Sequence, residues 1–155
     1  MSKIGYVDIK FNKRSEDLLD KIIEDIGLKK DFKDEYHCTI AHSKKPFDID
    51  LRANIKENCT IKGFGNFNTD NGLNLHVELD CLFCQSEFKR CIKNGAFYDH
   101  PKYIPHITLL YNCEKNGTKL KVKDLKRKLD KYIGLTLDII SESKSKLNKN
   151  WLKDN

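Results

Sequence analysis

The 155-residue sequence predicts a single α+β domain whose sheet is mainly antiparallel. Apolar and polar residues alternate in several short runs, a pattern typical of half-buried strands. Between these runs lie segments with apolar residues at helical spacing. Turn signals such as Asn71-Gly72 and Asn116-Gly117 connect neighbouring runs closely, and hairpins join antiparallel strands.

The N-terminal half is expected to hold one helix among its strands. Residues 4–11 predict the first strand, and Ser15 is expected to cap a helix whose apolar residues share one face. A charged loop then leads to a strand over residues 36–41. The Ser-Lys-Lys-Pro run at 43–46 is expected to end this strand. Residues 56–67 are again rich in strand-forming residues, with two glycines that suggest a bulge or bend.

The C-terminal half repeats this alternation of strands and helices. We expect strands over residues 73–79, 106–112 and 135–141, and helices over residues 82–93 and 122–133. The last helix carries a very basic outer face. The domain is expected to span residues 1–143, followed by a polar tail over residues 144–155.

Composition and charge limit the classes of protein that remain. The balance of 34% charged and 39% hydrophobic residues is ordinary for a globular domain, and the net charge of +6 favours an anionic partner. No apolar run has the length of a membrane span, and the N-terminus lacks the apolar region of a signal peptide. We therefore expect a cytoplasmic protein without a membrane partner. We also expect a monomer. Because an intracellular chain keeps its thiols reduced, the six cysteines are expected to be reduced and mostly buried. The one CxxC pair, Cys81 and Cys84, has no second pair with zinc-site spacing, so a zinc site is not expected.

Two four-residue segments share the pattern of His, any residue, Thr and an apolar residue. They are His37-Cys38-Thr39-Ile40 and His106-Ile107-Thr108-Leu109. Each lies in a predicted strand, where residues i and i+2 point to the same face. Each segment therefore presents an imidazole beside a hydroxyl, while the other two side chains point into the core. Two such segments facing one cleft would supply two proton-transfer groups and two hydrogen-bond donors. These groups are sufficient to cleave a phosphodiester without a metal.

The two residue types are expected to divide this chemistry. Because a phosphodiester is attacked in line, one of His37 and His106 would take a proton from the nucleophile while the other gives one to the leaving oxygen. Free imidazole titrates near pH 6.5 and can serve in either role. Thr39 and Thr108 would donate hydrogen bonds to the non-bridging oxygens. The sequence does not assign the acid and the base. No carboxylate cluster suited to Mg²⁺ stands out, so neither metal nor cofactor is predicted.

At these residues the chain resembles the two-histidine (2H) phosphoesterase superfamily, and within it most closely the phage anti-CBASS nucleases. The resemblance covers roughly residues 3–141. It implies a two-lobed α+β fold with helices outside and a central cleft, and it implies that His37, Thr39, His106 and Thr108 are catalytic. It further implies hydrolysis of small cyclic oligonucleotide signals as a means of viral immune evasion.

Substrate contacts are predicted from aromatic and basic residues near the motifs. Among the aromatic residues we favour Tyr6 and Phe67 as platforms for bases, and Lys44 and Lys102 as partners of phosphates. The other three histidines are expected to lie outside the reacting pair. A regular strand turns His42 away from His37, His76 alternates to the polar face of its strand, and His100 lies in a loop.

Two alternatives differ in substrate or in class. The substrate could instead be an RNA end with a 2′,3′-cyclic phosphate or a 2′,5′-linked oligonucleotide. Alternatively, the protein could be a basic nucleotide- or RNA-binding module, or a sponge, that binds without turnover. The basic stretch from Lys119 to Lys131 would serve an RNA partner, although such a charge run is usually a solvated face. Both motifs are intact, which favours an enzyme.

Overall fold

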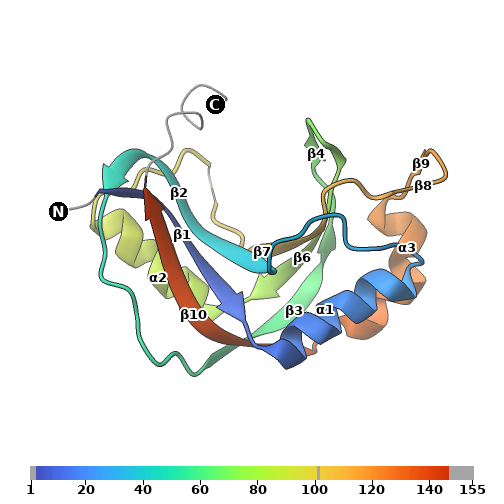
Figure 1. The fold of residues 1–155 in the computed structure, drawn as a ribbon, viewed down its shortest axis with the longest axis horizontal. Helices are drawn as coiled ribbons and strands as arrows, with labels where there is room; N and C mark the ends of the chain where they lie inside the picture. The colour runs from blue at the N-terminus through green and yellow to red at the C-terminus, as the bar shows by residue number, and fades with distance from the viewer. Residues whose placement is uncertain (1–2, 101, 147–155) are drawn as a thin grey trace.

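The computed structural model describes residues 3–100 and 102–146 and has an α+β fold (Figure 1). Six strands form a closed antiparallel barrel with neighbours in the order β1-β10-β3-β6-β7-β2. These strands are β1 (Ile4–Phe11), β2 (His37–Phe47), β3 (Glu57–Gly65), β6 (Leu75–Asp80), β7 (His106–Leu110) and β10 (Thr136–Lys146). The prediction of an α+β domain with a mainly antiparallel sheet is confirmed, while the two-lobed arrangement stays a prediction.

Helices and short hairpins complete the described part of the chain. Helix α1 (Lys13–Asp25) packs against β7 and β10, α2 (Leu82–Lys93) against β2 and β3, and α3 (Val122–Leu129) against β3. The hairpins β4 (Asn68–Thr69) with β5 (Gly72–Leu73) and β8 (Glu114–Lys115) with β9 (Thr118–Lys119) form at the two predicted Asn-Gly turns. None of the described helices combines the length and the apolar character needed to cross a membrane.

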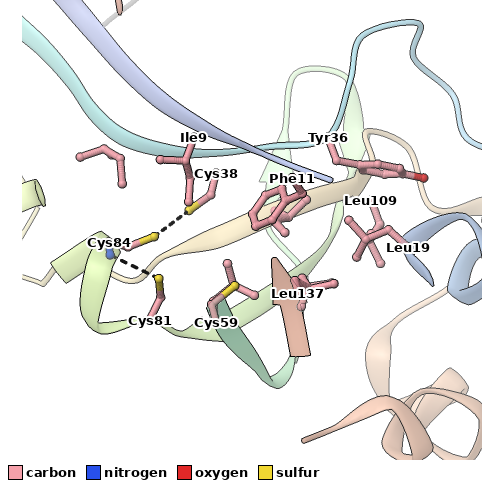
Figure 2. Packing of buried hydrophobic residues seen from close by; sticks show 14 of the residues in the cluster. Ile9, Phe11, Leu19, Tyr36, Cys38, Cys59, Cys81, Cys84, Leu109 and Leu137 are labelled. Atoms are coloured by element: carbon pink, nitrogen blue, oxygen red, sulfur yellow. Dashed lines mark hydrogen bonds between the residues drawn. The ribbon is translucent and has the colours of Figure 1, made fainter. Parts of the chain in front are cut away.

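The core joins side chains from the barrel strands and the helices (Figure 2). Ile9, Leu109 and Leu137 from the strands and Leu19 from α1 are fully buried. Each such aliphatic side chain contributes about 1.5–3 kcal/mol when it is buried. All six cysteines are free thiols within this core, as predicted.

The CxxC pair has a structural explanation at the start of α2. Cys81 is the N-cap residue, and its Sγ accepts a hydrogen bond from the backbone N–H of Cys84 at 3.2 Å. The thiol thus satisfies one of the donors that every helix leaves unpaired at its N-terminus. Figure 2 shows this contact beside the neighbouring pair formed by Cys38 and Cys84.

Three predicted boundaries were wrong, each for a local reason. Asn12, not Ser15, caps α1 by accepting the Ser15 N–H, while the buried Ser15 hydroxyl accepts the N–H of Asp138 in β10. The 43–46 run does not end β2, which continues to pair with β1 as far as Phe47. Its pairing with β7 is confined to Cys38, so Pro46 lies where β2 has β1 on one side only, and such an edge tolerates proline. Strand β10 continues to Lys146, beyond the predicted end at residue 141. The predicted tail past Lys146 lies outside the described residues.

A buried acidic pair fixes the β2–β3 connection to α2 and β10. The Glu142 side chain is 0% exposed and that of Glu87 is 2% exposed. One Glu142 oxygen accepts the backbone N–H of Arg52 at 2.9 Å and contacts the Arg90 guanidinium at 3.3 Å. No described residue donates a hydrogen bond to its other oxygen. Burial, together with the neighbouring Glu87 carboxyl, raises the pKa of Glu142 to about 7.

This pKa predicts a loss of stability as the pH rises. The folded protein holds a proton on Glu142 that the unfolded chain, with an ordinary glutamate pKa of about 4.3, releases earlier. The free energy of unfolding should therefore fall between about pH 4.3 and pH 7. Glu142→Gln should flatten this slope, because the amide cannot ionise. Urea unfolding across this range measures it, and Glu24→Gln on the exposed face of α1 is the matched control. Equal slopes for Glu142→Gln and the wild type would contradict the prediction.

Candidate functional site

The two His-x-Thr segments lie side by side in the barrel. Strands β2 and β7 pair antiparallel with Cys38 opposite Ile107, the central residues of the two motifs. This register places Thr39 opposite His106 and His37 opposite Thr108 on one face of the sheet. The predicted alternation is confirmed, because Cys38, Ile40, Ile107 and Leu109 are buried whereas the two histidines and two threonines are partly exposed.

This register relates the two histidines diagonally. Residues at i and j±2 of an antiparallel pair have Cα atoms about 7–8 Å apart, with long side chains still in reach of one another. Two imidazoles spaced in this way can flank a small anionic group from opposite sides. The two threonines occupy the other diagonal, so each hydroxyl lies opposite the imidazole of the other motif.

The protonation pattern of His106 follows from a backbone contact. Its Nδ1 lies 2.9 Å from the carbonyl oxygen of Ile104, and a carbonyl only accepts, so Nδ1 carries a hydrogen. In the neutral ring Nε2 then holds the lone pair and is ready to take a proton. No hydrogen bond joins the His37 ring to another described residue. The sequence did not identify the group that orients each imidazole; for His106 this group is the Ile104 carbonyl.

Tyr6 contacts the first motif through its hydroxyl. The Tyr6 Oη lies 2.9 Å from Thr39 Oγ1. Its ring also packs edge-on against the rings of His37 and His42, at centroid distances of 6.5 Å and 5.8 Å. Burial raises the pKa of Tyr6, so the phenol stays protonated. If the phenol donates to Thr39 Oγ1, the hydrogen of the Thr39 hydroxyl is left for a substrate oxygen.

A cavity of about 410 Å³ opens beside the motifs. Thr39 and His106 line it, whereas His37 and Thr108 are not among its lining residues. The remaining wall comes from β2 and from the loop before β7, and consists of Ile40, His42, Ser43, Lys44, Phe97, Tyr98, Asp99, His100, Tyr103 and Ile104. The cavity thus extends from one imidazole and one hydroxyl of the predicted site.

His42 lies on the site face, contrary to the expectation from a regular strand. Along β1, Val7 pairs with Ala41 and the next residue, Asp8, pairs with Thr39. Ile40 is thus an extra residue, and this β-bulge reverses the alternation beyond it. His42 therefore faces the same side as Thr39 and lines the cavity. Burial lowers the pKa of His42, although the Asp99 carboxylate opposes this effect.

His76 was expected on a polar strand face, as a surface or hydrogen-bonded histidine away from the reaction. It is hydrogen-bonded but not at the surface, because it is only 1% exposed. In β6 it pairs with Thr108 of β7 and with Gly65 of β3. Its ring centroid lies 5.2 Å from that of His106. Sequence reasoning missed this neighbour of the second motif, since a polar residue on a polar-looking strand face gave no sign of burial.

The predicted substrate contacts divide into two groups. Phe67 is 49% exposed and packs edge-on against His106 at 5.6 Å, so the structure brings it to the site. Lys44 lines the 410 Å³ cavity, with its Nζ 3.6 Å from Asp99. Lys102 instead lines a second cavity of about 480 Å³ beside β3 and the start of α2. The structure therefore does not place Lys102 in the cavity with Thr39 and His106.

The described residues offer no ready metal centre. Within residues 3–100 and 102–146, no group of three or more His, Cys, Asp or Glu side chains is arranged to hold a metal ion. The two motifs themselves present imidazoles and hydroxyls. Such a set can move protons and donate hydrogen bonds.

Comparison with known proteins assigns the family. The family model described as "Anti-CBASS protein Acb1" matches residues 3–154. A protein named anti-CBASS protein Acb1 from Escherichia phage RB16 is 27% identical over 133 residues, covering 85% of this chain and 75% of the relative. One of the same name from Vibrio phage KVP40 is 26% identical over 130 residues, covering 83% of this chain and 84% of the relative. The chain belongs to the anti-CBASS protein Acb1 family.

Proposed function

We propose that this protein is a metal-independent phosphodiesterase that cleaves small cyclic oligonucleotide signals. The observation that carries the proposal is the pairing of Cys38 with Ile107, which puts two imidazoles and two hydroxyls on one face of adjacent strands. The family supports the choice of substrate, because its relatives are named anti-CBASS proteins and come from phages. The reaction would remove an immune signal in the cytoplasm of an infected host cell.

The proposed reaction is an in-line displacement at phosphorus. One imidazole takes the proton of the nucleophile, either water or a neighbouring ribose 2′-OH, as the new P–O bond forms. The other imidazole gives its proton to the leaving oxygen as the old P–O bond breaks. His106 is suited to begin as the base, because its Nδ1–H is bound to the Ile104 carbonyl and Nε2 has the lone pair. His37 then begins as the acid.

The hydroxyls and the nearby aromatic residues would hold the substrate. Thr39 and Thr108 donate to the non-bridging oxygens as these gain negative charge. Phe67 offers its exposed ring for stacking with a base, a contact typically worth about 1–3 kcal/mol. The cavity beside Thr39 and His106 would receive a nucleoside on one side of the scissile phosphate.

A small substrate panel in EDTA tests this proposal. The panel holds cyclic di- and trinucleotides, 2′,5′-oligoadenylate and an RNA ending in a 2′,3′-cyclic phosphate. We expect EDTA-resistant cleavage of at least one cyclic oligonucleotide. Chromatography of the products measures this cleavage. Cleavage confined to the RNA end or to the 2′,5′ linkage would move the protein to another substrate. Tight binding of a cyclic oligonucleotide without cleavage would make it a sponge and overturn the mechanism.

A further inference from the structure

We propose that His76 is a positioning residue that holds the His106 ring in its reactive orientation through packing. This inference rests on the proposed function, since it concerns the same reacting histidine. His76 lies in β6, between Gly65 of β3 and Thr108 of β7. Its neighbour Glu78 pairs with His106, so His76 and His106 project from the same face of adjacent strands.

Two aromatic contacts place the His76 ring against the site. It stacks on Phe67 with a centroid distance of 4.3 Å and an interplanar angle of 21°. It meets the His106 ring edge-on at 5.2 Å and 62°. Phe67 also contacts His106, so the three rings form one packed group, the ring cluster. Within this cluster Phe67 is exposed and His106 is partly exposed, whereas His76 is buried.

A polar network fixes the ring cluster to the rest of the fold. Asn74 Oδ1 lies 3.2 Å from His76 Nδ1 and accepts the Phe67 backbone N–H at 2.7 Å. The Asn66 side chain donates to the Asn74 carbonyl at 2.7 Å and accepts the Val122 N–H at the start of α3 at 2.8 Å. Asn74 thus holds the His76 ring directly, and further hydrogen bonds connect Asn74 to residues 66–67 and through Asn66 to the start of α3.

The charge state of His76 suits this role. Burial and, to a lesser degree, the neighbouring His106 lower the pKa of His76 to about 4, although Glu78, 3.6 Å from Nε2, acts in the opposite direction. His76 is therefore neutral near pH 7. A second cation beside His106 would disfavour the protonated form that His106 passes through during the reaction. A neutral aromatic support avoids this cost.

Gly65 provides the space for the His76 ring and also a means to move it. A Cβ at this position would lie 2.6 Å from His76 Nε2 and 2.9 Å from its Cε1. Because the ring is buried against Phe67 and His106, Gly65→Ala should push it toward His106. Gly63 on the same strand has no atom within 4 Å of an added Cβ, so Gly63→Ala is the matched control.

The experiment compares four variants by steady-state kinetics on the cleaved panel member. His76→Ala and Gly65→Ala are expected to lower kcat by about 10- to 100-fold, with smaller changes in KM, because small displacements of a reacting group cost rates of this size. His76→Phe should recover most of the lost kcat, since it keeps the ring. Gly63→Ala should match the wild type. Thermal melting checks that each variant is folded.

A second readout does not depend on turnover. ¹⁵N NMR of the imidazole nitrogens reports the His106 tautomer, and we expect one Nδ1–H form in the wild type and a mixture in His76→Ala and Gly65→Ala. Wild-type kcat and tautomer in both variants would overturn the inference. A folded His76→Phe as inactive as His76→Ala would also overturn it, because the imidazole nitrogens would then be needed. If the wild type cleaves nothing, the proposed function fails and the tautomer still decides the role of His76.

Discussion

Replacing either His37 or His106 with alanine is expected to lower kcat by about 10²- to 10⁴-fold, the usual contribution of one general acid or base. Each imidazole moves a proton in the transition state, so the loss should appear in kcat. Binding should persist, because Phe67 and the cavity beside Thr39 remain. Steady-state kinetics and calorimetric titration of the same substrate measure the two effects separately.

The combination of the two changes sharpens this prediction. Since both imidazoles act in one displacement, the double variant should lose little more than the worse single variant, as is usual for groups that act as a unit. His106→Ala frees the Ile104 carbonyl, so its melting temperature must be compared with that of the wild type. Near-normal turnover in both folded single variants would exclude the acid-base assignment.

The second large effect is expected at the threonines. Thr108→Val should lower kcat by about 10²- to 10³-fold, the cost of removing one donor to a developing negative charge. Valine keeps the shape of threonine and removes only the hydroxyl. Thr39→Val should act in the same direction, but it also removes the Thr39 hydroxyl that lies 2.9 Å from the Tyr6 hydroxyl. Thr108 is therefore the cleaner test.

Serine and a remote threonine serve as controls. Thr108→Ser keeps the hydroxyl and should retain most of the activity, whereas Thr136→Val changes an exposed residue at the start of β10 and should change nothing. Tyr6→Phe removes the contact between the Tyr6 and Thr39 hydroxyls. The further loss of kcat in Tyr6→Phe/Thr39→Val then measures the hydrogen bond that Thr39 donates to the substrate. A Thr108→Val enzyme with wild-type kcat would show that this hydroxyl does not stabilise the transition state.

The alternation of side chains along a strand was enough to predict which face of each motif is polar. Cys38 and Ile107 point into the core and the histidines do not, because strand geometry is local. The pairing of Cys38 with Ile107 joins residues 69 positions apart along the chain, and no local pattern encodes it. The closed order of the barrel could not be predicted for the same reason.

The site residues that sequence reasoning misplaced have physical causes. His42 changed face because of the extra residue Ile40, and a one-residue bulge leaves no mark in an otherwise regular strand sequence. His76 lies on a strand face that alternates like a solvated one, yet Phe67 covers it. Gly65 was the available signal, since a glycine within a strand often marks a close approach, here by the His76 ring.

The pH dependence of kcat/KM in EDTA tests the two-imidazole mechanism most directly. We predict a bell-shaped profile for the wild type, because one of His37 and His106 must be neutral and the other protonated. In His106→Ala, the residual activity should lose one limb of the bell, and in His37→Ala the other. Loss of activity in EDTA, or a profile whose two limbs survive both substitutions, would contradict metal-free catalysis by this pair.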